Sequence, residues 1–434
     1  MKRTLAVLMF AALVFGGRSR AQTFDNFERG RAQDMLRAIA DDVRKNYYDP
    51  KFHGFDFDSR VRDAEDRLKK ATSLSQAFSI IAWTLDGLDD SHTYFVPPSR
   101  TTRTEYGWRM QMIGNHCYVT HVRPKSDAEV KGLKPGDEVL SVNGVVPDRN
   151  NFATMEYILN ILSPRAVLQV QLRGPDGQTR KVDVMSRVKQ LQKLVDLTSD
   201  TGFWNLIREL ENADRLARTR CKDAGSDLEI CKMPDFELED EQVRQIFSWA
   251  RKKKSLILDL RDNPGGSVDT LGHMIGGFFD HEVKIGDRVG RKAMKPQIAK
   301  GQHDPFTGQL VVLVDSDSAS AAELFARVMQ IEKRGTVIGD GSSGLVMEGR
   351  VFDHRAGTGS VVFYAAMVTD ADVVMTDGHS LERRGVTPDE LLLPSAADLV
   401  NNRDPVMARA AELLGVKMTA EEAGKLFPYE WPKE

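Results

Sequence analysis

Short apolar runs that alternate with helical lengths constrain the fold of this 434-residue chain more than any other feature. Between residues 227 and 339 the pattern predicts short buried strands separated by amphipathic helices. The strand signals are DLEICKM, SLILDL, QLVVLV and GTVIG, and the helix signals are EDEQVRQIFSWARKKK, VDTLGHMIGGFF and SASAAELFARVMQ. Strands joined by helical crossovers form layered sheets, so we expect an α/β domain here.

Two other patterns come before this region. Apolar residues recur at helical spacing over residues 25–48 and 75–88, which predicts a mainly helical N-terminal part. Residues 108–122 alternate like a strand, and residues 167–184 are typical of a hairpin, with a helical stretch at 151–162 between them. We therefore expect a helical subdomain, then a β-rich domain, then the α/β domain.

The first residues have the pattern of a secretory signal peptide. Lys2 and Arg3 precede an apolar run over residues 5–15, and small residues lead to a cleavage site after Ala21. A membrane anchor is the alternative, but the run is shorter than the ~20 residues that cross a bilayer. We expect an exported protein, periplasmic or extracellular, with no membrane span in its mature form.

Charge and cysteine content exclude several classes of function. A net charge of -3 gives no overall basic field, so we do not expect nucleic acid as a partner. The three cysteines form no CxxC pair, and we expect neither a metal nor a cofactor. Cys221 and Cys231 are close enough in sequence to bridge in an oxidising compartment, whereas Cys117, within an apolar alternation, is expected to be buried.

The stretch GLKPGDEVLSVNG, residues 132–144, closely resembles the signature of a PDZ domain. The resemblance covers about residues 104–187, and the matching positions are Gly132, Pro135, Gly136, Asp137, Asn143 and Gly144. It implies that an extended peptide adds to a sheet edge and that its terminal carboxylate meets backbone N–H groups of a loop. By the same resemblance that loop comprises Tyr106, Gly107, Trp108 and Arg109, although YGWR is not the usual small, apolar loop.

Two loops of the α/β region could carry chemistry. Asn263, Pro264, Gly265 and Gly266 follow a buried strand, and consecutive glycines let backbone N–H groups approach a ligand; a tight turn is the plain alternative. No GK[ST] follows, so this is not a phosphate loop.

The second loop is DSDSASAAELF, residues 315–325. Ser320 and Glu323 have the spacing of a capping box, which requires nothing catalytic. A strand, a sharp turn, a serine and a helix start also present a nucleophile beside fixed N–H donors.

Taken together, LILDLRDNPGG, VVLVDSDSASAAELF and an upstream PDZ domain resemble the tail-specific or C-terminal processing serine peptidases. The resemblance implies a crotonase/ClpP-like α/β peptidase core with an N-terminal helical subdomain and an inserted PDZ domain. It implies Ser320 as the nucleophile, and an oxyanion hole from Ala321 and from Gly265 or Gly266.

The base differs from the usual one. Many tail-specific peptidases have a lysine where GDGSSGLVM, residues 339–347, has Leu345. The branch that shares the core of tricorn protease has instead a histidine preceded by serine, assisted by a glutamate, and Ser91, His92 and Glu382 match these positions. His379 is a competing base, and a catalytically inactive peptide-binding scaffold is the alternative function.

These patterns predict an exported serine endopeptidase that acts on protein or peptide substrates, near their C-termini, with a homo-oligomer left open. The expected divisions are a signal peptide (1–21), a helical subdomain (22–103), a PDZ domain (104–187), a peptidase core (188–400) with a polar insert (188–226), and a C-terminal helical tail (401–434).

Overall fold

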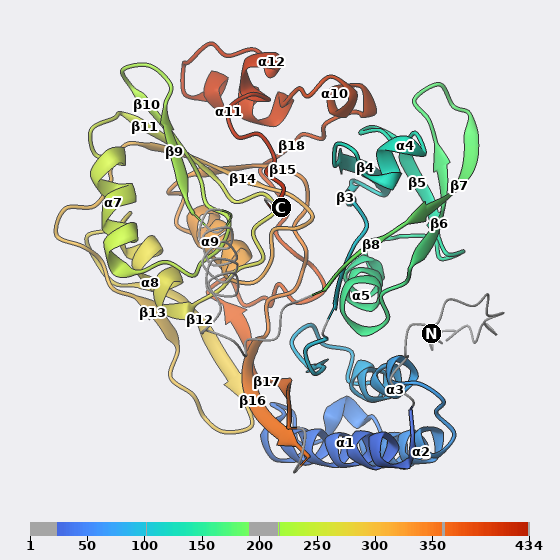
Figure 1. Cartoon of the computed structure of the whole chain (residues 1–434). Helices are drawn as coiled ribbons and strands as arrows, with labels where there is room; N and C mark the ends of the chain where they lie inside the picture. The colour runs from blue at the N-terminus through green and yellow to red at the C-terminus, as the bar shows by residue number, and fades with distance from the viewer. Residues whose placement is uncertain (1–23, 101, 191–215, 217, 358–360, 433–434) are drawn as a thin grey trace, which may run out of the picture.

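The computed structural model describes residues 24–100, 102–190, 216, 218–357 and 361–432, so the predicted signal peptide and much of the predicted insert lie outside the described residues. Figure 1 shows helices α1–α3 at one end, the α/β core in the middle and the helices α10–α12 at the other end, with a β-rich domain beside the core. This is the predicted arrangement of a helical subdomain, an inserted β-rich domain and an α/β core.

The core is a mostly parallel sheet with helices on both faces. Its strands run in the order β18-β15-β14-β11-β10-β9, and β9 is the antiparallel member. Their bounds are β9 Arg220–Asp223, β10 Leu228–Lys232, β11 Ser255–Asp259, β14 Gln309–Val314, β15 Thr336–Gly339 and β18 Glu390–Leu391. One face is covered by α7 Asp240–Ala250, α8 Val268–Gly276 and α9 Ala321–Ile331.

Alternation along the central strand explains the two-sided burial. Leu256 and Leu258 of β11 pack with Phe247 and Phe325 on the side of α7 and α9, whereas Ile257 packs on the opposite side. That opposite side is covered by the C-terminal helices α11 Pro405–Leu413 and α12 Ala420–Ala423, whereas α10 Ala396–Val400 lies against Gly136 of the inserted domain. The C-terminal tail is therefore part of the core packing.

A second sheet joins the N-terminal helices to the core. The helices are α1 Asn26–Asn46, α2 Phe57–Lys69 and α3 Leu74–Asp86. The sheet consists of β1 Tyr94–Val96, β12 Val283–Gly290, β13 Gln297–Ala299, β16 Glu348–Ala356 and β17 Val362–Met375. Because β1 pairs antiparallel with β17, with Phe95 opposite Ala366, the loop between α3 and β1 is held against the core.

The inserted domain is a five-stranded antiparallel sheet in the order β3-β4-β5-β6-β7. Its elements are β3 Trp108–Ile113, β4 His116–Val122, α4 Asp127–Val130, β5 Glu138–Val142, α5 Phe152–Tyr157 with η2 Ile158–Leu162, β6 Val167–Arg173 and β7 Thr179–Met185. The chain enters and leaves through a two-stranded ribbon of β2 Thr102–Glu105 and β8 Arg187–Gln190. The predicted strands, hairpin and helix of this domain are confirmed.

Polar contacts join the inserted domain to the core at its edge strand β3. Arg109 donates two hydrogen bonds to Asp262, and Gln111 donates to Asp315. The Ser316 hydroxyl donates to the carbonyl of Met112. In these three residue pairs the core residue lies in a loop that follows β11 or β14, and Arg149 of the inserted domain also pairs with Asp340, which follows β15.

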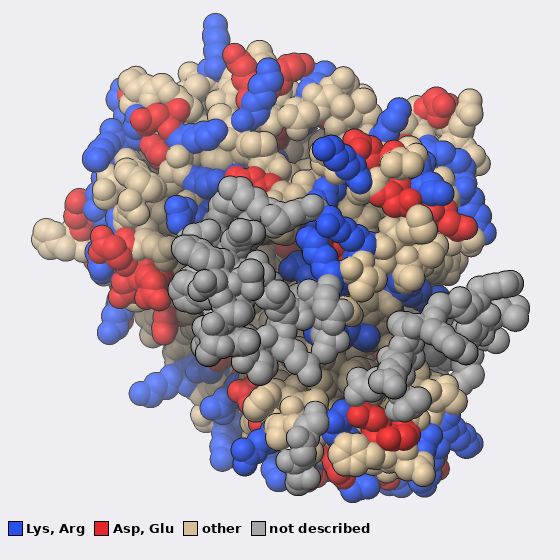
Figure 2. Space-filling model, viewed as in Figure 1, with Lys and Arg blue, Asp and Glu red and all other residues tan. Residues whose placement is uncertain are grey.

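The described part of the chain contains no helix that is both long and apolar enough to cross a membrane. On the face drawn in Figure 2, lysine and arginine side chains are interspersed with aspartate and glutamate. Cys221 and Cys231 face each other across β9 and β10 and form a disulfide, and Cys117 is buried, as expected.

Candidate active site

The nucleophile candidate lies at the carboxyl edge of the core sheet. Because β11 and β14 are adjacent and parallel, the loops that follow them emerge side by side at this edge. Ser320 precedes α9 and has φ 53° and ψ -119°, a conformation that non-glycine residues rarely adopt. Its N–H donates to the carbonyl of Leu345 (2.9 Å) and to Oε2 of Glu323 (3.0 Å). The turn therefore holds a half-buried serine in a strained conformation.

Gly265 lies directly against Ser320. A Cβ on Gly265 would be 2.6 Å from Cβ of Ser320 and 2.9 Å from the nitrogen of Ala321, and its φ is +93°. Both the contact and the backbone conformation therefore require glycine. The predicted glycine loop and the predicted serine are brought together.

The N–H groups of the glycine loop and the nucleophile turn differ in what they contact. The N–H of Gly265 donates to Oδ1 of Asn263 (2.8 Å). Within the described part of the chain, the N–H groups of Gly266 and Ala321 donate to no acceptor. Gly266 and Ala321 are therefore the positions whose N–H groups are free to face a ligand.

Ser91, His92 and Glu382 form a hydrogen-bonded relay, although 291 positions separate Ser91 from Glu382. The Ser91 hydroxyl lies 2.7 Å from Nδ1 of His92 and donates to Oε2 of Glu382 (2.9 Å), and the N–H of Ser91 donates to Oε1 (3.0 Å). Since the hydroxyl has one proton and gives it to Glu382, Nδ1 of His92 carries the proton that faces Ser91. This tautomer leaves Nε2 with a free lone pair.

Asp90 fixes the backbone that carries the imidazole. Its Oδ1 accepts from the N–H groups of His92 (2.9 Å) and Thr93 (2.8 Å) and from the hydroxyl of Thr369 (2.6 Å). Burial lowers the pKa of His92 below its usual value, and the charge of Asp90 partly opposes this shift. His92 is therefore neutral at physiological pH.

One short stretch of chain connects the relay to the serine. The carbonyl of Leu345 accepts from the N–H of Ser320, and the N–H of Val346 donates to Oε2 of Glu382 (3.0 Å). A Cβ on Gly349 would be 3.2 Å from Cβ of His92. Ser320 and the relay thus flank the same segment, although the Ser320 hydroxyl and the imidazole make no direct hydrogen bond within the described residues.

Glu323 has a larger role than the predicted capping box. Its buried carboxylate accepts from the N–H of Ser320, the hydroxyl of Ser342 (2.6 Å), and the N–H groups of Gly344 (2.7 Å) and Leu345 (3.0 Å). Burial raises its pKa to about 7, although these four donors oppose the shift. It holds the nucleophile turn and the 342–345 segment together.

The other predicted site residues lie as follows. His379 is exposed, and its N–H donates to Asp377; no hydrogen bond joins it to Ser91, His92 or Glu382 among the described residues. Tyr106 and Trp108 are buried in the inserted domain, where the Tyr106 hydroxyl donates to the carbonyl of Leu159. Arg109 is engaged by Asp262, so its guanidinium contacts the core.

Sequence reasoning missed Asp90 and the full role of Glu323. Asp90 stands two positions before His92, a spacing at which aspartate caps backbone N–H groups, and this signal was available. The contacts of Glu323 with residues 342–345 depend on the fold and left no local signal.

Among the described residues, one group of potential metal ligands has its ligand atoms close enough together to hold an ion. It consists of Cys221, Glu229 and Cys231. The two sulfurs are joined in a disulfide, and a disulfide supplies no thiolate ligand. This cluster therefore binds no metal in the bridged protein.

Comparisons with known proteins agree with this geometry. The model for Peptidase family S41 matches residues 229–392, and the model for the PDZ domain matches residues 98–173. A carboxyl-terminal-processing protease of Picosynechococcus sp. is 24% identical over 405 residues, covering 89% of this chain and 88% of the relative. A tail-specific protease of Haemophilus influenzae is 24% identical over 270 residues, covering 59% of this chain and 36% of that protein.

A solved structure shows the same fold. Mature CPAF superposes with a TM-score of 0.63 at 15% identity, covering 86% of this chain and 94% of the CPAF chain. The matched models and relatives make this chain a serine peptidase with a PDZ domain. Its core, residues 229–392, is similar to Peptidase family S41, and its relatives are named carboxyl-terminal-processing or tail-specific proteases; the inactive-scaffold alternative is not supported.

Proposed function

We propose that this peptidase cleaves protein or peptide substrates near their C-termini, with Ser320 as nucleophile and His92 as general base. The observation that carries the proposal is the Ser91–His92–Glu382 relay, because it leaves a lone pair on Nε2 of a neutral imidazole. Leu345 at the lysine position cannot accept a proton, so the base must come from elsewhere. The relay supplies it from the N-terminal helical subdomain.

In the proposed reaction, Nε2 of His92 takes the proton of the Ser320 hydroxyl as its oxygen attacks the substrate carbonyl. The negative charge that develops on the carbonyl oxygen is stabilised by the N–H of Ala321 and that of Gly266, since the N–H of Gly265 already donates to Asn263. His92 then gives its proton to the leaving amine, and water releases the acyl group by the reverse proton transfers. Ser91 and Glu382 keep the imidazole in its tautomer and stabilise its charged form.

We assign peptide capture to the PDZ domain. Its strand β3 lies at the sheet edge, where an extended peptide can add next to the Met112 carbonyl that already accepts from the Ser316 hydroxyl of the core. Because Tyr106 and Trp108 are buried and Arg109 is paired with Asp262, the 106–109 loop would contribute backbone N–H groups and not these side chains.

We also propose export to the periplasm or the extracellular space. The predicted signal peptide and the Cys221–Cys231 disulfide support this assignment, since disulfides persist in oxidising compartments.

A serine-directed fluorophosphonate tests the catalytic proposal. We expect labelling of the wild type and of Leu345→Ala, no labelling of Ser320→Ala, and loss of peptide hydrolysis in His92→Ala. Peptides with free and blocked C-termini, analysed by mass spectrometry, then test the preference for C-termini. Full hydrolysis by His92→Ala would move the base to another residue, and labelling of Ser320→Ala would move the nucleophile.

A further inference from the structure

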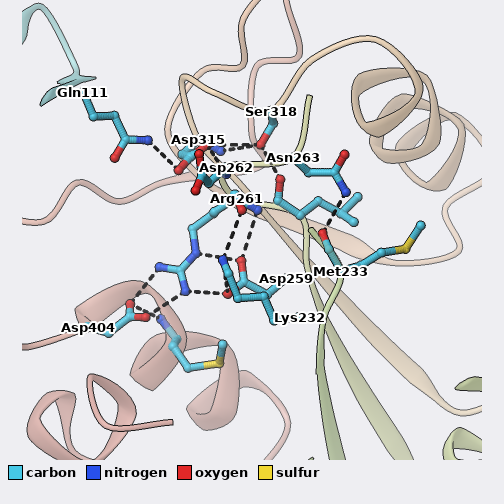
Figure 3. Close-up of polar contacts among 12 residues, drawn as sticks. Gln111, Lys232, Met233, Asp259, Arg261, Asp262, Asn263, Asp315, Ser318 and Asp404 are labelled. Atoms are coloured by element: carbon cyan, nitrogen blue, oxygen red, sulfur yellow. Dashed lines mark hydrogen bonds and ion pairs between the residues drawn. The ribbon is translucent and has the colours of Figure 1, made fainter. Parts of the chain in front are cut away.

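An ion-pair network lies directly before the glycine loop. Figure 3 shows the guanidinium of Arg261 between the carboxylates of Asp259 and Asp404. Nε and Nη2 of Arg261 donate to Asp259 (2.8 and 2.9 Å), and Nη1 and Nη2 donate to Asp404 (2.9 and 2.7 Å). Lys232 lies 3.5 Å from Asp259 and donates to the carbonyl of Arg261 (3.1 Å). The charges of the two basic side chains therefore balance those of the two carboxylates.

These groups are largely removed from water. The Asp259 side chain is 1% exposed, and those of Arg261 and Asp404 are 19% and 18% exposed. Burial opposes ionisation, but Arg261 and Lys232 hold the pKa of Asp259 well below its usual value. Burial likewise disfavours the charge of Arg261, but Asp259 and Asp404 raise its pKa. The network is ionised, and each charge depends on its partners.

Arg261 is covalently continuous with the loop that contacts the nucleophile. The N–H of Asp262 donates to Asp315 (3.0 Å), and the carbonyl of Asn263 accepts from the N–H of Ala319 (2.9 Å). Gly265 then packs against Ser320. A shift of Arg261 would therefore be transmitted through four peptide units to the N–H of Gly265 and through five to that of Gly266.

Asp404 comes from another part of the molecule. It is the N-cap of α11, where its Oδ1 accepts from the N–H of Met407 (2.9 Å), and it lies beyond residues 229–392 that match the S41 model. We propose that Asp404 is a positioning residue: through Arg261, the C-terminal tail holds the glycine loop in the geometry that the oxyanion hole requires. This inference rests on the proposed function of Ser320.

The test compares Asp404→Asn with a matched control in the full chain. Asparagine has nearly the same shape and still caps α11 with its oxygen, so the variant removes the charge that faces Arg261 and the acceptor that Nη2 of Arg261 uses. Asp398→Asn is the control, because Asp398 is 16% exposed, lies in the same tail, pairs with Arg403 (3.4 Å) and takes part in the cap of α10 with Ser395, as Asp404 does in the cap of α11. Asp404→Glu restores the carboxylate.

We expect Asp404→Asn to lower kcat roughly 10- to 100-fold with KM changed by less than about twofold, as small misplacements of reacting groups do. The rate of Ser320 phosphonylation should fall in parallel, and amide hydrogen exchange at residues 262–266 should accelerate. Asp398→Asn should match the wild type, and Asp404→Glu should recover part of the lost kcat.

Two results would overturn the inference. The first is that Asp404→Asn has the same kcat and the same amide hydrogen exchange as Asp398→Asn. The second is that activity falls only in proportion to the loss of folded protein, while amide hydrogen exchange at residues 262–266 is unchanged. Failure of the proposed function is distinguishable, because Ser320→Ala would then remain active, and hydrogen exchange would still report on the Asp404–Arg261 contact.

Discussion

A histidine acts as a base only while its lone pair faces the proton that it must take, and the contacts of His92 decide this. The resemblance to the branch that shares the core of tricorn protease implied Ser91, His92 and Glu382 as candidates, and the structure brings all three together. The tautomer could not be predicted, because it depends on a hydrogen bond to a residue 291 positions away. Whether His92 serves Ser320 stays a prediction.

The pH dependence of kcat/KM tests the state of His92. The imidazole must be neutral to act as a base, and burial lowers its pKa, so activity should persist below the ordinary histidine pKa of ~6.5 and fall only at lower pH. Asp90 and Glu382 are the carboxylates that face this site, with Arg383 3.7 Å from Glu382. Glu382→Gln should lower kcat. It should also move the loss of kcat/KM at acidic pH to still lower pH, because a negative charge that favours the imidazolium form of His92 is removed. An acid limb clearly above ~6.5 would contradict this account.

At the scale of elements, apolar periodicity predicted β10, β11, β14 and β15 and the helices α7, α8 and α9. It did not predict the hairpin of β16 and β17, which joins the helical subdomain to the core. β17 contains Asp370, Asp372 and several alanines, residue types that are depleted in strands, so its local signal was weak. Its partners β1 and β12 come from distant parts of the chain.

The contact between the glycine loop and the nucleophile turn gives a test at this scale. Gly265→Ala would place a methyl group 2.6 Å from Cβ of Ser320 at a φ of +93°, so we expect loss of phosphonate labelling. Gly272→Ala is the control, because Gly272 lies within α8 with nothing within 4 Å of an added Cβ. It should keep labelling and stabilise the fold by ~0.5–1 kcal/mol, measured by denaturant unfolding. Equal labelling of the two variants would show that the close approach is not required.

At the scale of the whole molecule, two separate parts of the chain meet the loop that follows β11, and a third lies against Glu382 and Gly349, beside the segment that contacts Ser320. The helical subdomain contributes His92, the PDZ domain contacts Asp262 through Arg109, and the C-terminal tail contacts Arg261 through Asp404. The tail also reaches the PDZ domain, where the Tyr429 ring packs 4.2 Å from that of His121 and Arg123 donates to the carbonyl of Pro432 (2.8 Å). Sequence patterns cannot reveal such contacts, because they report only on neighbours along the chain.

A crystal structure of the enzyme with a bound fluorophosphonate tests the central claim most directly. The account predicts phosphorus bonded to Oγ of Ser320, Nε2 of His92 within about 3 Å of that oxygen, and the phosphonyl oxygen facing the N–H of Ala321. Phosphorus on another residue, or an imidazole beyond hydrogen-bonding reach of Ser320 while a different base contacts it, would contradict the account.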